Sequence, residues 1–204
     1  MEYTQYPTNT FKQLTIGAGV LLTSFDPSSA SVTNANILGA TTGGNNFTAK
    51  PTYTDFGADI DNVPKNTKEL KRIDDWDVKL TGTMVAVTPA AARWMAAAAD
   101  LTDGTGKITP RSTLDLTATT GDFRDLWLVA DYSDINDNVT GTTTKTAGFV
   151  AIKMMNALST GGFQIQTADK EKGKFAFEFT AHYSKDTADT VPFEIYIKAG
   201  TVTT

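Results

Sequence analysis

His182 is the only histidine of the chain, so it is the one candidate for a histidine general base near neutral pH. Glu178 precedes it by four residues, which places both side chains on the same face of an extended strand. A Ser-His-Glu hydrolase would also need a nucleophilic serine, but no G-x-S-x-G sequence marks one. We therefore interpret His182 as a surface or lumen-lining residue, and we predict no catalytic residue and no enzyme.

Two aspartate-rich segments have side chains that could hold a cation. Residues 134–138 resemble the first part of a calcium loop, but Val139 stands where the loop needs glycine and Lys145 where it needs glutamate. Three aspartates surround Trp76, and the charged start of a strand accounts for them better than a metal does. A solvated loop and a solvated strand end are therefore predicted, and no metal site.

Residues 17–22 begin like a dinucleotide-binding fingerprint, with glycines at positions 17 and 19. The third glycine is missing, and the segment lies within a predicted strand instead of before a helix. We interpret both glycines as packing residues and predict no cofactor. The chain also lacks cysteine, which excludes disulfide scaffolds, thiolate metal sites and cysteine catalysis.

The composition fits one β-rich domain with a mildly acidic surface. The chain has 204 residues, and 18 basic against 23 acidic side chains give a net charge of −5. This balance argues against a nucleic-acid binder that needs a basic face. No apolar run approaches the roughly 20 residues of a membrane helix, and the polar first ten residues lead us to expect no export signal.

Alternating apolar and polar residues predict most of the secondary structure. The clearest strands cover residues 76–87 and 175–183, and threonine is unusually common, as expected for sheet faces that contact water. One helix is predicted over residues 90–99, with Thr88 as its N-cap and Pro89 at its first position. We expect a mainly β protein, an antiparallel β-sandwich or flattened barrel with one flanking α-helix.

The chain has no linker that would divide it, so we predict a single domain over residues 1–204 with extended segments. These are an N-terminal arm at 1–12, a long loop between strands at 57–75 and a C-terminal tail at 199–204. The loop carries charges of both signs and few large apolar residues. Because so few apolar side chains cannot offset the entropy of ordering the loop, we expect it to fold against a neighbouring subunit.

The order of these parts resembles the major tail (tail tube) proteins of long-tailed bacteriophages. A polar arm leads to a glycine-bearing strand at 16–22, and a turn at 43–46 leads into the next strand at Phe47. A charged loop through residues 56–61, the long strand 76–87 and a helix at 89–101 follow, and the second half is β-rich. The resemblance covers most of the chain, but its motifs are loose.

This resemblance implies a non-enzymatic structural subunit of the virion tail, assembled in the host cytoplasm. Six copies would form a ring, each adding about four strands to a β-barrel around a channel, and stacked rings would conduct DNA to the host. The long loop would bridge to neighbouring subunits. Tape-measure, tail-terminator and tail-tip proteins would be partners, DNA would pass without specific binding, and no membrane would be involved. Tubes of contractile injection systems share this fold and are an alternative.

Two sets of candidate residues follow from these interpretations. The polar faces of the two best strands give the lumen-facing candidates Lys79, Thr81, Thr83, Glu178, Thr180 and His182. These residues could equally face the outer solvent. The long loop gives the inter-subunit candidates Asp59, Ile60, Asp61, Val63, Lys65, Lys68, Glu69 and Leu70.

Two other classes of protein compete with a tube subunit. A non-enzymatic β-sandwich adhesin would be a monomer and would usually carry an export signal. A carbohydrate-active enzyme would need a pair of acidic residues that converge in a groove with raised pKa values. The acidic residues of this chain lie mostly in predicted loops and turns, which fits solvation better than catalysis.

Overall fold

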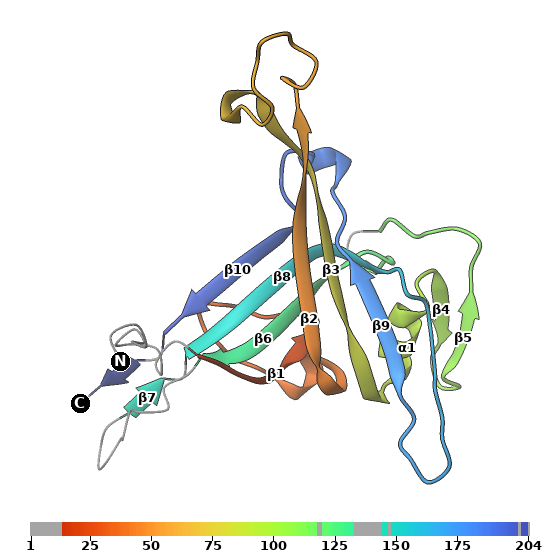
Figure 1. Cartoon of the computed structure of the whole chain (residues 1–204). Coiled ribbons are helices and arrows are strands. Elements are labelled where there is room, and N and C mark those ends of the chain that lie inside the picture. Colours follow the sequence, from red (N-terminus) through yellow and green to blue (C-terminus); the bar gives the residue numbers. More distant parts are fainter. Residues whose placement is uncertain (1–13, 118–119, 133–143, 147, 200, 204) are drawn as a thin grey trace.

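The computed structural model describes residues 14–117, 120–132, 144–146, 148–199 and 201–203 (Figure 1). The arm predicted at 1–12 and the segment at 134–138 that resembles a calcium loop lie outside the described residues. Within the predicted C-terminal tail at 199–204, residues 201–203 form a short strand.

Seven strands form one antiparallel sheet in the order β10-β8-β6-β1-β2-β3-β9. They are β1 (Thr15–Leu22), β2 (Ile37–Asp55), β3 (Lys71–Val87), β6 (Arg124–Tyr132), β8 (Gly148–Ser159), β9 (Phe175–Thr180) and β10 (Phe193–Lys198). The end of β8 also pairs with β9, so the sheet curls until it closes on itself. The prediction of a mainly β, antiparallel, barrel-like fold with one α-helix is confirmed for the described residues.

Two small two-stranded sheets and one helix accompany the large sheet. One is a hairpin of β4 (Ala99–Thr102) and β5 (Lys107–Pro110), and the other pairs β7 (Thr144–Thr146) with β11 (Thr201–Thr203). The helix α1 spans Pro89–Met95. Short 3-10 turns lie at Asn34–Asn36, Lys68–Leu70 and Lys185–Thr187.

The helix begins where the sequence predicts and ends earlier. The Thr88 hydroxyl accepts a hydrogen bond from the Ala91 amide at 3.2 Å, which is the expected N-cap. Ala97 has a positive φ of 60°, which stops the helix, and the chain enters β4 at Ala99. The predicted end at residue 99 is therefore wrong: tertiary contacts outweigh the strong helix propensity of the alanine run.

The sheet packs its two faces into two separate apolar clusters. The main core fills the inside of the curl with residues from β1, β2, β3, α1, β6, β8 and β9. A smaller cluster lies on the outer face of β6 and β8, where the segment between β1 and β2 covers it with Phe25. The helix belongs to the main core: the Trp94 ring lies 5.1 Å from that of Phe179. The flanking helix therefore packs on the inside of the curl and not on the outer face of the sheet.

Strands β2 and β3 form a long hairpin that projects from the body (Figure 1). Their pairing runs from Gly39 opposite Val87 to Asp55 opposite Lys71. The turn predicted at 43–46 is a bulge inside β2, where Gly43 and Gly44 have φ values of 76° and 84° and the register shifts. Such positive φ values suit glycine, so the sequence signal was real but marked a bulge instead of a turn.

The tip of this hairpin is shorter than the predicted loop. Residues 71–75 belong to β3, and the Phe56 amide donates a 3.0 Å hydrogen bond to the Leu70 carbonyl, which closes the tip. Val63 and Leu70 are half-buried beside Gly57, where an added Cβ would lie 2.8 Å from Leu70. The segment therefore makes contacts within its own chain, and the prediction that it becomes ordered against a neighbouring subunit stays a prediction.

The tip depends on the carboxylate of Asp55. It accepts hydrogen bonds from the Asn66 amide at 2.9 Å and the Gly57 amide at 3.0 Å. The bond from Asn66 first, then that from Gly57 and the nearby Lys71 ammonium, hold the pKa of Asp55 below its ordinary value of 3.8. A lowered pKa stabilises the folded tip above pH 3.8, and this stabilisation is lost as the pH falls through the folded pKa.

We therefore expect Asp55→Asn to loosen the tip at neutral pH, because a neutral amide accepts these two hydrogen bonds less strongly than a carboxylate does. Hydrogen exchange at the Gly57 and Asn66 amides should be faster than in the wild type. Asp61→Asn, at an exposed position of the same tip, is the control and should leave this exchange unchanged. Equal protection in both variants would show that Asp55 does not hold the tip.

Candidate lumen surface

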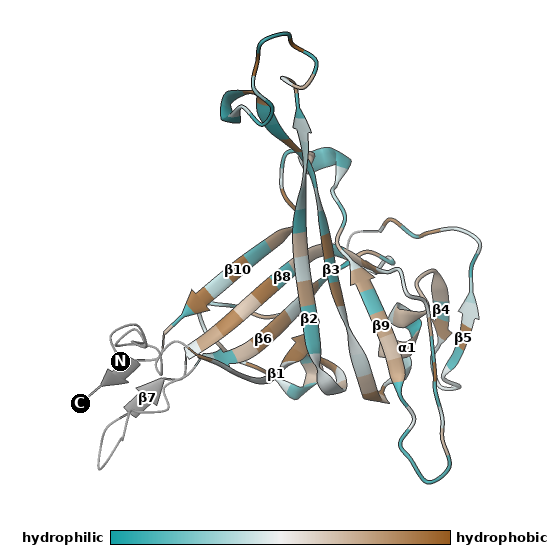
Figure 2. Ribbon diagram, in the orientation of Figure 1, coloured by the Kyte–Doolittle hydropathy of each residue, from teal (hydrophilic) through white to brown (hydrophobic). Residues whose placement is uncertain are grey.

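Strands β3 and β9 bring five of the six lumen-facing candidates onto one surface. Their register places Lys79 opposite Thr180 and Thr81 opposite Glu178, and Thr83 lies two residues further along β3. The residues between them, such as Leu80 and Phe179, point the other way and are buried in the main core. In Figure 2 a hydrophilic band interrupts the otherwise largely hydrophobic β9.

Strand β2 extends this polar surface on the other side of β3. Thr48 lies opposite Lys79, and Asn46 lies opposite Thr81. Thr160, just after β8, reaches the surface from the other edge, with its hydroxyl 2.8 Å from that of Thr180. We call this surface the threonine face; it comprises Thr42, Asn46, Thr48, Lys79, Thr81, Thr83, Thr160, Glu178 and Thr180.

The charged groups of the threonine face have neighbours that balance them. Lys79 Nζ lies 3.2 Å from the carboxylate of Asp77, the next outward-pointing residue of β3. Asp77 also lies opposite Lys50 of β2. Glu178 accepts a 3.0 Å hydrogen bond from the Thr160 hydroxyl. Around Lys79 and Glu178 two positive and two negative groups therefore balance, whereas Lys170, Lys172 and Lys174, with Glu171, lie beside the Thr42 end of the face.

His182 lies apart from the threonine face. It follows the end of β9, and its ring packs edge-on against Phe123 with 5.2 Å between ring centroids. Its Nδ1 lies 3.2 Å from the Asn156 carbonyl, and its side chain is half-buried. The ring of His182 therefore packs beside β6 and β8. The alternation along β9 had predicted that it shares a surface with Glu178 and Thr180.

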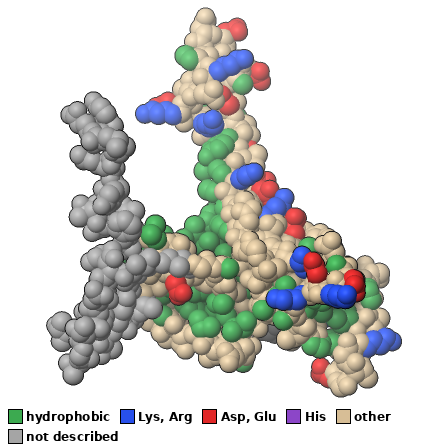
Figure 3. All heavy atoms as spheres, turned by 60° about the horizontal axis from the view of Figure 1, so that its bottom comes forward, with side chains coloured by type: hydrophobic (Ala, Val, Ile, Leu, Met, Phe, Trp, Pro, Cys, Tyr) green, Lys and Arg blue, Asp and Glu red, His purple; other side chains and the backbone are tan. Residues whose placement is uncertain are grey.

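All eight inter-subunit candidates lie at or beside the hairpin tip. Lys68 and Glu69 form an exposed ion pair at 3.4 Å, and Figure 3 shows side chains of both charges interspersed over the tip. Large apolar side chains are exposed along the same hairpin. They are Tyr53, Phe56, Ile60 and Ile73, between 47% and 58% exposed. The hairpin therefore presents both charged and apolar groups outside the body.

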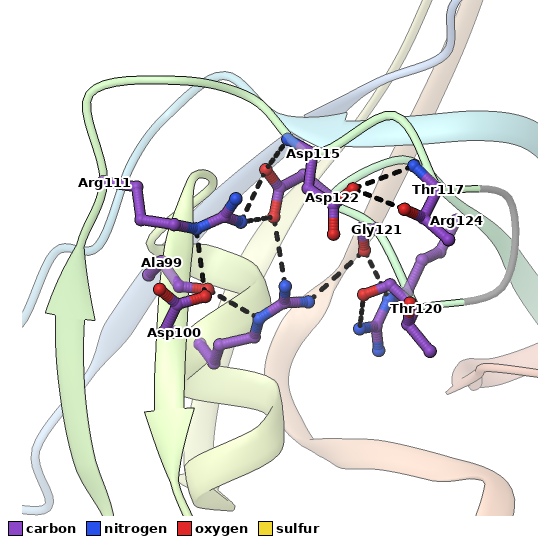
Figure 4. Close-up of polar contacts among 10 residues, drawn as sticks. Ala99, Asp100, Arg111, Asp115, Thr117, Thr120, Gly121, Asp122 and Arg124 are labelled. Atoms are coloured by element: carbon purple, nitrogen blue, oxygen red, sulfur yellow. Dashed lines mark hydrogen bonds and ion pairs between the residues drawn. The ribbon is translucent and has the colours of Figure 1, made fainter.

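The strongest electrostatic feature, which we did not predict from the sequence, is a buried cluster around Asp122 (Figure 4). The Asp122 carboxylate is fully buried and accepts hydrogen bonds from Arg111 at 2.7 and 2.9 Å. It also accepts one from Arg93 at 3.1 Å and one from the Asp115 amide at 2.8 Å. Two guanidinium groups and one amide thus converge on a single carboxylate.

The two arginines connect this carboxylate to the elements around α1. Arg93, on the helix, donates to the Ala99 carbonyl at 2.8 Å and to the Gly121 carbonyl at 3.3 Å. Arg111, just after β5, also forms an ion pair with Asp100 of β4 at 3.0 Å. Because its polar groups are engaged with one another in the interior, we interpret the cluster as structural: it fixes α1 and the β4–β5 hairpin to the start of β6.

Metal-binding groups and membrane-spanning helices are two further features that would point to a function. No group of three or more His, Cys, Asp or Glu residues in the described part of the chain is placed to hold a metal ion. Within the same residues, no helix has the length and apolar character needed to cross a membrane. Comparisons with protein-family models, with curated proteins and with solved structures found no match. The threonine face and the hairpin are therefore the features on which a function can be argued.

Proposed function

We propose that this protein is the structural subunit of a phage tail tube, in which hexameric rings stack into a hollow tube that conducts DNA. The observation that carries the proposal is the threonine face, a polar surface on β2, β3 and β9 whose reverse side forms the main core. A strand face that is polar outside and apolar inside suits the wall of a water-filled channel. The wall would be non-enzymatic, and DNA would pass along it.

The charge of this surface supports passage without binding. Lysines on a channel wall would hold the phosphate backbone by releasing its counterions, and DNA would adhere. On the threonine face Lys79 is paired with Asp77, and the remaining groups are mostly hydroxyls. The whole subunit is acidic, and six copies of a net charge of −5 give about −30 per ring, which repels DNA further.

The hairpin supports the proposal as the element that would join subunits. Exposed apolar side chains such as Phe56 and Ile60 favour association. Covering them with a neighbouring subunit lowers the free energy by about 25 cal/mol for each Å² of apolar surface buried. The exposed charges around them would provide specificity, because like charges placed opposite each other oppose a wrong alignment. In the proposed tube this hairpin therefore contacts an adjacent subunit, in the tail of the virion.

A tube subunit of a contractile injection system needs the same channel wall and the same joining element, and it remains the nearest alternative. Negative-stain microscopy of the purified protein at rising concentration tests the proposal. We expect six-fold rings and then tubes with a central channel. Single particles of subunit size at every concentration would favour the β-sandwich adhesin instead.

Reversing one charge on the threonine face should make the channel retain DNA. Glu178→Lys adds two positive charges per subunit, or about twelve per ring, and places a lysine where no carboxylate balances it. Tubes of this variant should co-sediment with duplex DNA, and more so at low salt. Asp103→Lys makes the same change in the turn between β4 and β5 and is the control. If both variants retained DNA equally, Glu178 would not face the channel.

A further inference from the structure

Strand β10 is the last strand of the large sheet and pairs on one side only, with β8. Among the described residues no strand covers its other edge, so a row of backbone N–H and C=O groups is open to pairing. Two large apolar side chains stand on this strand in contact with water: Ile195 is 52% exposed and Ile197 is 63% exposed. An edge of this kind readily accepts another strand.

The last five residues of β10 have an order that complements itself. They read Glu194, Ile195, Tyr196, Ile197 and Lys198, with opposite charges at the two ends and isoleucines at equal distances from the centre. When two copies of such a strand run antiparallel and are centred on Tyr196, each glutamate lies opposite a lysine of the other copy. Each Ile195 then lies opposite an Ile197.

We propose that the occupant of this edge is a second copy of the same chain, bound through β10 about a two-fold axis. Glu194, Tyr196 and Lys198 share one face of the strand, and the two isoleucines share the other, because side chains alternate along a strand. The pairing therefore places two Glu–Lys pairs on one face and two isoleucine pairs on the other. The Tyr196 hydroxyl already donates a hydrogen bond to the Glu194 carboxylate, which holds that side chain along the strand.

The charges of Glu194 and Lys198 favour this register over the other registers that the two strands could adopt. A shift of the second strand by two residues keeps the faces but removes both charge pairs, so the centred register is favoured. A parallel arrangement in register would place Glu194 opposite Glu194 and Lys198 opposite Lys198, which is unfavourable. The antiparallel pair centred on Tyr196 is the one alignment in which both charges and both isoleucines are matched.

This dimer is independent of the proposed function. A two-fold contact uses the same surface on both copies and stops at two, whereas a ring needs two different surfaces on each subunit. If both proposals hold, the dimer is a form of the free subunit in which the sheet edge is covered before assembly.

Sedimentation equilibrium of charge-reversed variants tests the inference. Wild-type protein should form dimers, and Lys198→Glu should raise the dimer dissociation constant by about tenfold or more, because both ion pairs become repulsive at once. The double variant Glu194→Lys with Lys198→Glu exchanges the charges and should restore the dimer. Lys185→Glu, at a side chain that is 90% exposed and lies off this edge, is the matched control and should leave the dimer intact.

A cysteine at the centre of the pair gives an independent measurement. The chain contains no cysteine, so Tyr196→Cys introduces the only thiol, and in the proposed dimer it lies next to the same thiol of the second copy. Mild oxidation should give a disulfide-linked dimer, and Lys185→Cys should not. A wild type that is monomeric throughout, or a dimer that survives Lys198→Glu unchanged, would overturn the inference. Wild-type assemblies that are only hexamers or larger would overturn it as well.

Discussion

Asp122→Ala is expected to lower the free energy of unfolding by about 3–5 kcal/mol, the usual cost of removing one partner from a buried ion pair. The variant leaves Arg93 and Arg111 facing each other in the interior without the carboxylate that both now contact. It also removes the acceptor of the Asp115 amide. Equilibrium unfolding in urea measures the effect.

Asp100→Ala is the matched control for this prediction. Its carboxylate also pairs with Arg111, but the side chain is 65% exposed, so its loss should cost less than about 1 kcal/mol. The difference between the two variants in the free energy of unfolding measures how much the burial of Asp122 contributes. Similar small losses in both would mean that water reaches the cluster, and that it does not fix α1 to the sheet.

Trp94→Ala is expected to cost about 3–5 kcal/mol of stability, in the range for a fully buried aromatic side chain. Trp94 is 1% exposed and packs on Phe179 within the main core. Removing the indole leaves a cavity between α1 and β9 that the rigid sheet can fill only in part. Thermal and urea unfolding, followed by the near-ultraviolet signal, measure the loss.

Leu116→Ala provides the comparison, because this large apolar side chain is 77% exposed and buries little surface. Its stability should stay within about 0.5 kcal/mol of the wild type. A Trp94→Ala variant that was equally stable would contradict the position of the helix against the core.

Local patterns predicted the strands and the start of the helix well. Strands β3 and β9 alternate so regularly that their two faces could be assigned from sequence, and Leu80 of β3 and Phe179 of β9 point inward as that alternation requires. Thr88 and Pro89 likewise predicted the start of α1, because capping depends on neighbouring residues alone. Both are properties of short segments.

The features that escaped prediction depend on distant residues. The structural role of Asp122 depends on its contact with Arg93, which lies 29 residues away in the chain. Nothing in the sequence around either residue marks them as partners. The glycines at 43 and 44 suggested a turn, but the pairing of β2 with β3 continues beyond them and converts the turn into a bulge. His182 fits the polar alternation of β9, yet Phe123, from another strand region, decides its position.

The central claim is that the threonine face lines the channel of a tube, and a cryo-electron microscopy reconstruction of the assembled protein tests it most directly. The account predicts stacked six-fold rings whose inner wall is formed by β2, β3 and β9, with Thr81, Lys79 and Thr180 facing the channel. It would be contradicted by a tube in which these side chains face outward, or by an assembly that has no channel at all.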